Sequence, residues 1–188
     1  FKYNNITKKN FMSYCKASSL LEEHPSPSIN GVECATGSLG HGFPFSCGLA
    51  LANKIKKNND KTIVMISDGE CNEGTTWEAA MFAAAQNLTN LTLVIDYNKW
   101  QATGRTDEIL KIKPLDKKFK SFGWDTIVIN GHNFKQIKSA FKKKNKKPKV
   151  IIANTIKGSG IDFMEDDNNW HYRSPSKIEM NDILKKLS

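Results

Sequence analysis

The segment TIVMISDGECNEG, residues 62–74, is the part of this chain that decides the fold class. It opens with an apolar run from Thr62 to Ser67, passes through Asp68-Gly69, and continues into a helical pattern from Gly74. A buried strand that leads directly into a helix is the repeating unit of parallel α/β sheets. Because ligands of such sheets bind beyond the carboxyl ends of the strands, a functional site is expected in the loop after Ser67.

The same alternation continues along the rest of the chain. Further apolar runs predict strands at 91–97, 126–130 and 150–155, and helical patterns predict helices at 45–57, 74–86, 115–122 and 134–144. Ser176 and Glu179 form a capping box, which predicts a last helix to about Leu187. The strands are continuously apolar, which predicts burial on both faces. We therefore predict a three-layer αβα fold with a mainly parallel sheet, formed by residues 1–188 as a single domain.

The composition is that of an ordinary soluble protein and argues against several classes. No apolar run reaches the roughly 20 residues of a membrane span, and the first residues lack a signal pattern, so we expect a cytoplasmic protein without a membrane partner. Four cysteines without a CxxC pair indicate reduced thiols rather than a zinc site.

The net charge of +9 comes partly from lysines in 54–57 and 142–149. These clusters contain no aromatic residues for base stacking, so nucleic acid is not the expected partner.

Two loops supply a pair of oxygen ligands. Asp68 follows the first predicted strand, and Asn98 closes the second one, 30 residues later. If these parallel strands are neighbours, both side chains lie at the same edge of the sheet. An Asp carboxylate, an Asn carbonyl and diphosphate oxygens form the all-oxygen shell that Mg²⁺ prefers. Gly69 permits close approach of a phosphate, and the helix from Gly74 offers free N–H groups. These residues therefore predict a site for Mg²⁺ and a diphosphate.

The pair Asp68-Gly69 and Asn98 resembles the fingerprint of thiamine-diphosphate enzymes, and the surrounding sequence looks like the amino-terminal half of transketolases. Further stretches agree in order and spacing, namely His24-Pro25, TGSLGHG at 36–42, Glu73-Gly74-x-x-Trp77-Glu78-Ala79, and IKGSG at 156–160 continuing to Trp170-His171. The resemblance spans about residues 20–175. Each motif alone is weak, whereas five collinear motifs are specific.

The resemblance implies which residues hold the cofactor thiamine diphosphate and its Mg²⁺. Asp68 and Asn98 correspond to metal ligands, and the backbone carbonyl of Trp100 corresponds to a third. The stretch at 37–39 corresponds to the backbone that meets the aminopyrimidine ring. The implied cofactor-binding residues are Gly37, Ser38, Leu39, Gly69, Glu70, Glu73, Asn98 and His171.

The resemblance also implies catalytic residues and a contact between subunits. His24 corresponds to a histidine that reaches the substrate, and His171 corresponds to one that touches both the diphosphate and the substrate. Glu73 and Glu78 correspond to carboxylates that link two active sites across a dimer interface. His24 and His171 are therefore the expected catalytic residues.

Several features depart from the family pattern. Ser67 and Tyr172 stand where glycines are common, and the upstream segment that supplies further substrate-site histidines is absent from the sequence. The glutamate that activates the cofactor belongs to a pyrimidine-binding domain, of which this chain shows no trace. The resemblance therefore implies one half of a split transketolase, which assembles with a C-terminal transketolase chain into a heterotetramer.

The implied activity is transfer of a two-carbon ketol unit from a ketose, or ketose phosphate, to an aldose acceptor, with activity only in the presence of the partner. Two alternatives stay open. The chain could serve another thiamine-diphosphate enzyme, one that decarboxylates 2-oxo acids or forms a branched sugar. It could also be a non-catalytic domain that binds phosphate or nucleic acid, which predicts salt-sensitive binding.

Overall fold

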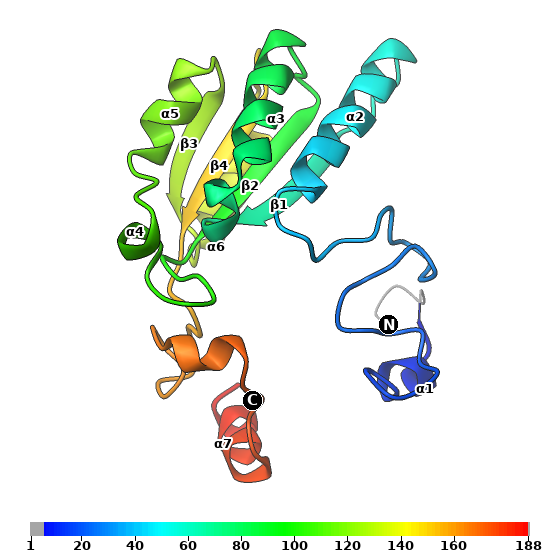
Figure 1. Ribbon diagram of the computed structural model, residues 1–188, viewed down its shortest axis with the longest axis vertical. Coiled ribbons are helices and arrows are strands. Elements are labelled where there is room, and N and C mark those ends of the chain that lie inside the picture. Colours follow the sequence, from blue (N-terminus) through cyan, green and yellow to red (C-terminus); the bar gives the residue numbers. More distant parts are fainter. Residues whose placement is uncertain (1–5, 188) are drawn as a thin grey trace.

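A parallel four-stranded sheet forms the centre of the molecule in a computed structural model, which describes residues 6–187 (Figure 1). The spatial order is β1-β2-β4-β3, and all three pairings are parallel. The strands are β1 (Thr62–Ser67), β2 (Leu91–Tyr97), β3 (Asp125–Asn130) and β4 (Lys149–Asn154). This confirms the four predicted strands, with shifts of a single residue in β3 and β4.

The helices also follow the prediction closely. They are α1 (Lys8–Phe11), α2 (Gly42–Ile55), α3 (Gly74–Ala85), α4 (Thr106–Ile109), α5 (Leu115–Ser121), α6 (Phe134–Lys142) and α7 (Lys177–Leu187), with 3₁₀ helices η1 (Gly69–Asn72) and η2 (Asn168–His171). Helix α2 begins three residues before the predicted Phe45. Its earlier start places Pro44 in the first turn, where the missing N–H of proline is tolerated.

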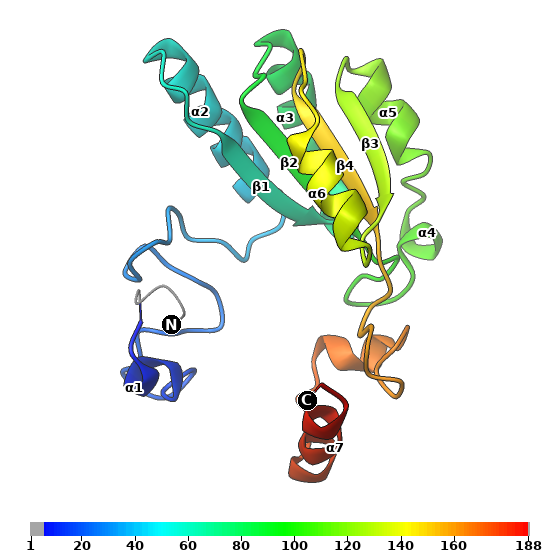
Figure 2. The ribbon, with the colours of Figure 1, turned by 180° about the vertical axis from the view of Figure 1, so that it is seen from behind.

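Helices cover the two faces of the sheet unequally. Helices α2, α3 and α5 lie on one face, and α6 lies on the other (Figures 1 and 2). The small side chains of α3 let it pack closely on the sheet. The main core contains Phe43, Cys47, Ala50, Ala79, Ala80, Ala83, Leu91, Leu93, Ile95, Phe119, Trp124, Val150 and Ile152. A second core lies under α6 and contains Ile129, Ala140, Ile151 and Ala153. The predicted three-layer αβα fold is confirmed.

Burial on both faces was predicted for every strand and holds only for part of the sheet. Strand β4 is buried from Lys149 to Ala153. On β1, by contrast, Ile63 and Met65 are 58% and 67% exposed, and Val128 of β3 is 52% exposed. The prediction was wrong for β1 because α6 packs over β3 and β4 only. It was wrong for Val128 because this side chain lies on the face of β3 opposite α6, at the edge of the sheet. Within residues 6–187, no helix lies over β1 on the face that α6 covers elsewhere (Figure 2).

The chain outside the sheet extends beyond the carboxyl ends of the strands. The amino-terminal segment with α1 and the carboxyl-terminal segment with η2 and α7 lie on different sides there (Figures 1 and 2). Among the described helices, none combines the length and the apolar character needed to cross a bilayer. The four cysteines, Cys15, Cys34, Cys47 and Cys71, are free thiols.

A buried lysine of β4 caps the carboxyl end of helix α6. Lys149 is 3% exposed, and its Nζ donates to the carbonyl oxygens of Ala140 (3.3 Å), Phe141 (3.3 Å) and Lys143 (2.6 Å). These are the carbonyls that a helix end leaves without partners. We expect Lys149→Met to lower the free energy of unfolding by about 1–3 kcal/mol, because it leaves them unpartnered. Urea denaturation of both chains measures the change, with exposed Lys147→Met as the matched control.

The pH dependence gives a second measure of the same side chain. Burial lowers the pKa of Lys149 below 10.5, and the nearby charge of Lys61 adds to this. Between the folded and unfolded pKa values, unfolding takes up a proton, so the free energy of unfolding rises as the pH is raised. We expect Lys149→Met to lose this rise. If the free energy of unfolding of Lys149→Met rose equally with pH, the lowered pKa would not belong to Lys149.

Candidate functional site

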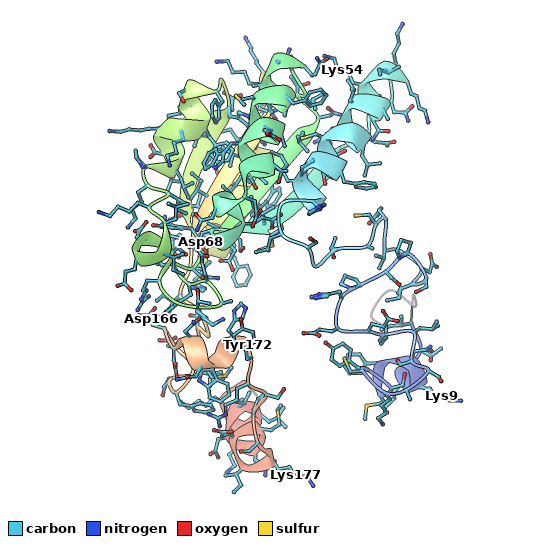
Figure 3. The ribbon with its side chains drawn as sticks, viewed as in Figure 1. Lys9, Lys54, Asp68, Asp166, Tyr172 and Lys177 are labelled. Carbon is cyan, nitrogen blue, oxygen red and sulfur yellow. The ribbon has the colours of Figure 1, made fainter. Side chains whose placement is uncertain are left out.

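Asp68 lies at the carboxyl end of β1 and is completely buried (Figure 3). Its Oδ2 accepts the N–H of Lys99 (3.0 Å) and the hydroxyl of Thr106 (2.8 Å). Its Oδ1 is also buried and has no hydrogen-bond partner within residues 6–187. Burial raises the pKa of Asp68, and the bonds from Thr106 and Lys99 oppose this rise. Since a buried carboxylate oxygen without a partner is unfavourable, this geometry suits a cation bound at Oδ1.

Asn98 follows β2, the strand that pairs with β1, so it lies at the same edge of the sheet as Asp68, as the sequence predicted. Strands β1 and β2 are neighbours, with Ser67 opposite Asp96, and the N–H of Asp68 donates to the carbonyl of Asp96 (3.1 Å). The Nδ2 of Asn98 donates to Oδ2 of Asp96 (3.2 Å), and its Oδ1 accepts the N–H of Trp100 (2.9 Å). These bonds fix the carboxamide. The remaining lone pair on Oδ1 can serve a metal.

Residues 99–106 form a small hairpin after β2. The N–H of Thr106 donates to the carbonyl of Lys99 (3.0 Å), the N–H of Gln101 donates to that of Gly104 (2.8 Å), and Trp100 pairs with Arg105. Both residues at the base of this hairpin bond to the Asp68 carboxylate. Asp68 therefore holds in place the loop that carries Trp100, whose carbonyl is the third predicted metal ligand.

A three-residue cluster joins this hairpin to the segment after β4. Arg105 donates to both carboxylate oxygens of Asp166 (2.6 and 2.5 Å) and stacks on the Trp100 ring, 3.7 Å from its centroid. The Nε1 of Trp100 donates to the same carboxylate (2.9 Å). Arg105 and Trp100 lower the pKa of Asp166 to about 2. The cluster links the hairpin to the chain that leads to His171 and Tyr172 (Figure 3).

The loop at 36–42 is held by η1 and α3. The N–H of Gly40 donates to Oε1 of Glu70 (2.9 Å), and its carbonyl accepts the hydroxyl of Thr75 (2.7 Å). Gly40 has φ +79°, and a Cβ there would lie 2.4 Å from Oγ1 of Thr75. Only glycine fits this conformation and this close approach. Glu70 is 8% exposed, and burial raises its pKa, which the Gly40 N–H partly opposes.

The predicted cofactor residues fall into two neighbouring groups. A cavity of about 710 Å³ lies beside β1 and α2, and Gly37, Ser38, Leu39 and Glu70 line part of it. Asp68, Gly69 and Asn98 do not line this cavity; they lie at the ends of β1 and β2. The two groups are joined by η1, because Asp68 precedes this helix and Glu70 belongs to it.

The two predicted catalytic histidines occupy different segments. The ring of His24 packs on Gly37, where a Cβ would lie 2.5 Å from Cγ of the histidine. His171 is exposed in η2, with its ring 4.7 Å from that of Tyr172. Within residues 6–187, no hydrogen bond or ion pair joins either histidine to Asp68. Glu73 is exposed and lies beside Gly40, and Glu78 is exposed on α3.

Sequence reasoning missed several polar residues of this edge. Among residues 6–187, six buried side-chain atoms have no hydrogen-bond partner, in Asp68, Asn72, Tyr97, Gln101, Asp107 and Asn168. All six residues lie at or beyond the carboxyl ends of the strands. Only Asp68 was named from the sequence, because a Gln or Asn in a loop gives no signal of its own. Such a concentration of unpartnered polar atoms is typical of a ligand site.

The fold and this edge together define an open parallel α/β domain whose candidate site lies beyond the carboxyl ends of its strands. The chain belongs to the transketolase family: residues 2–187 match the family described as transketolase, thiamine diphosphate binding domain. This confirms the resemblance that the sequence motifs carried.

Individual relatives agree with this assignment. The chain is 40% identical over 178 residues to an apulose-4-phosphate transketolase subunit from Actinobacillus succinogenes, covering 93% of this chain and 64% of that protein. It is 36% identical over 173 residues to the corresponding protein from Phocaeicola vulgatus, covering 90% and 62%. The transketolase structure from Campylobacter jejuni superimposes with a TM-score of 0.82 at 29% identity, covering 86% of this chain and 27% of that one. The chain thus spans less than two-thirds of these relatives.

Proposed function

We propose that this chain is the diphosphate-binding subunit of a transketolase-like enzyme. The enzyme transfers a two-carbon ketol unit from a ketose or ketose phosphate to an aldose acceptor. The observation that carries the proposal is the buried Asp68, whose free Oδ1 lies at the edge of the sheet next to Asn98, in a member of the transketolase family. Relatives whose names describe them as one subunit of a transketolase support an enzyme built from two kinds of chain.

The described residues fit Mg²⁺ and a diphosphate. Oδ1 of Asp68 needs a partner, Asn98 and the carbonyl of Trp100 add oxygen ligands, and Gly69, the residue after Asp68, would offer its backbone to a phosphate. When bound, thiamine diphosphate supplies the carbon nucleophile that cleaves the ketose. The loop at 37–39, with Glu70 and Glu73 behind it, orients the aminopyrimidine ring.

The protein would also manage protons on the sugar. His24 and His171 would accept and return protons on substrate hydroxyl groups, a task suited to imidazole near neutral pH. His24 would act from the side of Gly37, on which its ring packs, and His171 from the segment after β4. The acid that activates the cofactor would come from a pyrimidine-domain partner, in a cytoplasmic heterotetramer of two copies of each chain.

Calorimetric titration with thiamine diphosphate and Mg²⁺ tests this function. We expect binding by the chain mixed with a C-terminal transketolase chain, and loss of that binding when EDTA removes the metal. The chain without the partner is the comparison, because the aminopyrimidine ring would lie between the subunits. Absence of binding in both samples would overturn the proposal.

A different thiamine-diphosphate reaction is the second candidate, and Tyr172 favours it. This side chain is 77% exposed beside His171, where the family commonly has glycine, so it would narrow the approach of a sugar. A screen of ketose and aldose pairs against 2-oxo acids, with the partner present, separates the two reactions. Turnover of a 2-oxo acid alone would replace ketol transfer.

A further inference from the structure

The side chain of Gln101 lies against the glycine that is predicted to contact the diphosphate. A Cβ placed on Gly69 would lie 3.0 Å from Cγ and 3.5 Å from Cδ of Gln101. Gln101 comes from the hairpin after β2, and Gly69 begins η1 after β1. The carboxamide therefore folds back across the edge of the sheet and reaches the site from a loop that carries no recognised motif at this position.

Two buried atoms without partners, one acceptor and one donor, call for different ligands. Oδ1 of Asp68 is an acceptor and suits a cation. Nε2 of Gln101 is a donor, is buried, and has no partner within residues 6–187. The N–H₂ group of an amide whose Cδ would lie 3.5 Å from a Cβ on Gly69 needs an acceptor, and the oxygens of a phosphate are strong acceptors.

We propose that Gln101 donates a hydrogen bond from Nε2 to an oxygen of the cofactor diphosphate. This inference rests on the proposed function, because that function supplies the diphosphate. It adds a binding residue from the hairpin to the ligands at Asp68, Gly69 and Asn98.

The hairpin holds Gln101 in this position before a ligand arrives. Its base bonds to Asp68 through Lys99 and Thr106, and its Trp100–Arg105 pair is fixed by Asp166. The backbone N–H of Gln101 donates to Gly104 within the same turn (2.8 Å). Such fixation lowers the entropy lost on binding, so a single hydrogen bond can have a measurable effect on affinity.

Two substitutions at Gln101 test the proposal in the mixture of the two chains. Gln101→Ala removes the donor, and we expect thiamine diphosphate to bind about 10-fold more weakly. Gln101→Glu keeps the shape and places a negative charge against the diphosphate, so we expect about 100-fold weaker binding. Gln86→Glu, with an exposed side chain at the far end of α3, adds the same charge away from the site and controls for net charge. Affinity is measured by calorimetry at saturating Mg²⁺, and thermal unfolding confirms that each variant is folded.

The outcomes separate this inference from the function on which it rests. If wild type binds and Gln101→Glu binds equally well or more tightly, the amide does not donate to the diphosphate, and the proposed function still stands. Stronger dependence on Mg²⁺ in Gln101→Glu would mean that the side chain faces the metal, which also overturns the inference. If wild type itself binds no thiamine diphosphate, the proposed function fails first, and the role of Gln101 fails with it.

Discussion

Asp68→Asn is expected to weaken Mg²⁺-dependent binding of thiamine diphosphate by about 100-fold or more, because the loss of an outer-shell partner of a metal ligand already costs about 10–100-fold. The amide retains an oxygen that can accept from Lys99 and Thr106, so the hairpin keeps its anchor. Its other atom is an N–H₂ donor, which cannot coordinate a cation. The variant therefore removes the charge and one ligand while changing little else.

The same substitution should stabilise the folded chain. Burial raises the pKa of Asp68 above 3.8, so the ionised carboxylate is unfavourable in the fold at neutral pH. A neutral amide avoids this cost, and we expect the midpoint of urea denaturation to rise in the absence of metal. Loss of ligand affinity together with higher stability is typical of a functional residue.

Calorimetry and urea denaturation measure these two effects on Asp68→Asn. Asp60→Asn makes the same change at an exposed position before β1, where neither affinity nor stability should shift. Unchanged binding of thiamine diphosphate by Asp68→Asn would remove Asp68 from the metal site. Reduced stability would instead indicate that the carboxylate has a structural role.

The features that could be predicted from the sequence are those encoded over short distances. The apolar run at 62–67 and the turn at Asp68-Gly69 specify β1 and its loop. Asn98 directly follows β2 as Asp68 directly follows β1, which places both residues at the same edge of the sheet. Parallel pairing then brings the two residues together without further information.

The remaining features depend on contacts between distant loops. The bonds of Asp166 to Arg105 and Trp100 join residues about 60 positions apart, and no local pattern marks any of them. The exposure of Ile63 and Met65 likewise depends on where α6 packs, and the strand sequence reads the same whether or not its second face is covered. Gln101 could be recognised only from the structure, by its buried, unpartnered nitrogen and by its position against Gly69.

Glu70→Ala is expected to lower the free energy of unfolding by about 1–3 kcal/mol, because it leaves the buried N–H of Gly40 without an acceptor. Gly40 would then keep the bond from Thr75 to its carbonyl and lose the bond from its N–H to Glu70. Since this loop carries Gly37 to Leu39, we also expect about 10-fold weaker binding of thiamine diphosphate, as for the loss of other outer-shell partners. Urea denaturation and calorimetry measure the two effects, and exposed Glu22→Ala is the control.

Glu70→Gln separates the hydrogen bond from the charge. The amide oxygen can still accept from Gly40, so this variant should keep the affinity that Glu70→Ala loses.

Burial raises the pKa of Glu70 above 4.5, so the wild-type fold binds a proton more tightly than the unfolded chain. The resulting stability is fully present below pH 4.5 and is lost as the pH rises through the folded pKa. The free energy of unfolding of Glu70→Gln does not fall in this way. Measured in urea, the free energy of unfolding of the variant relative to that of wild type should therefore increase from pH 4.5 towards neutral pH. If Glu70→Gln is as damaging as Glu70→Ala at every pH, the ionised carboxylate itself is required, and its role lies in the site rather than in holding the loop.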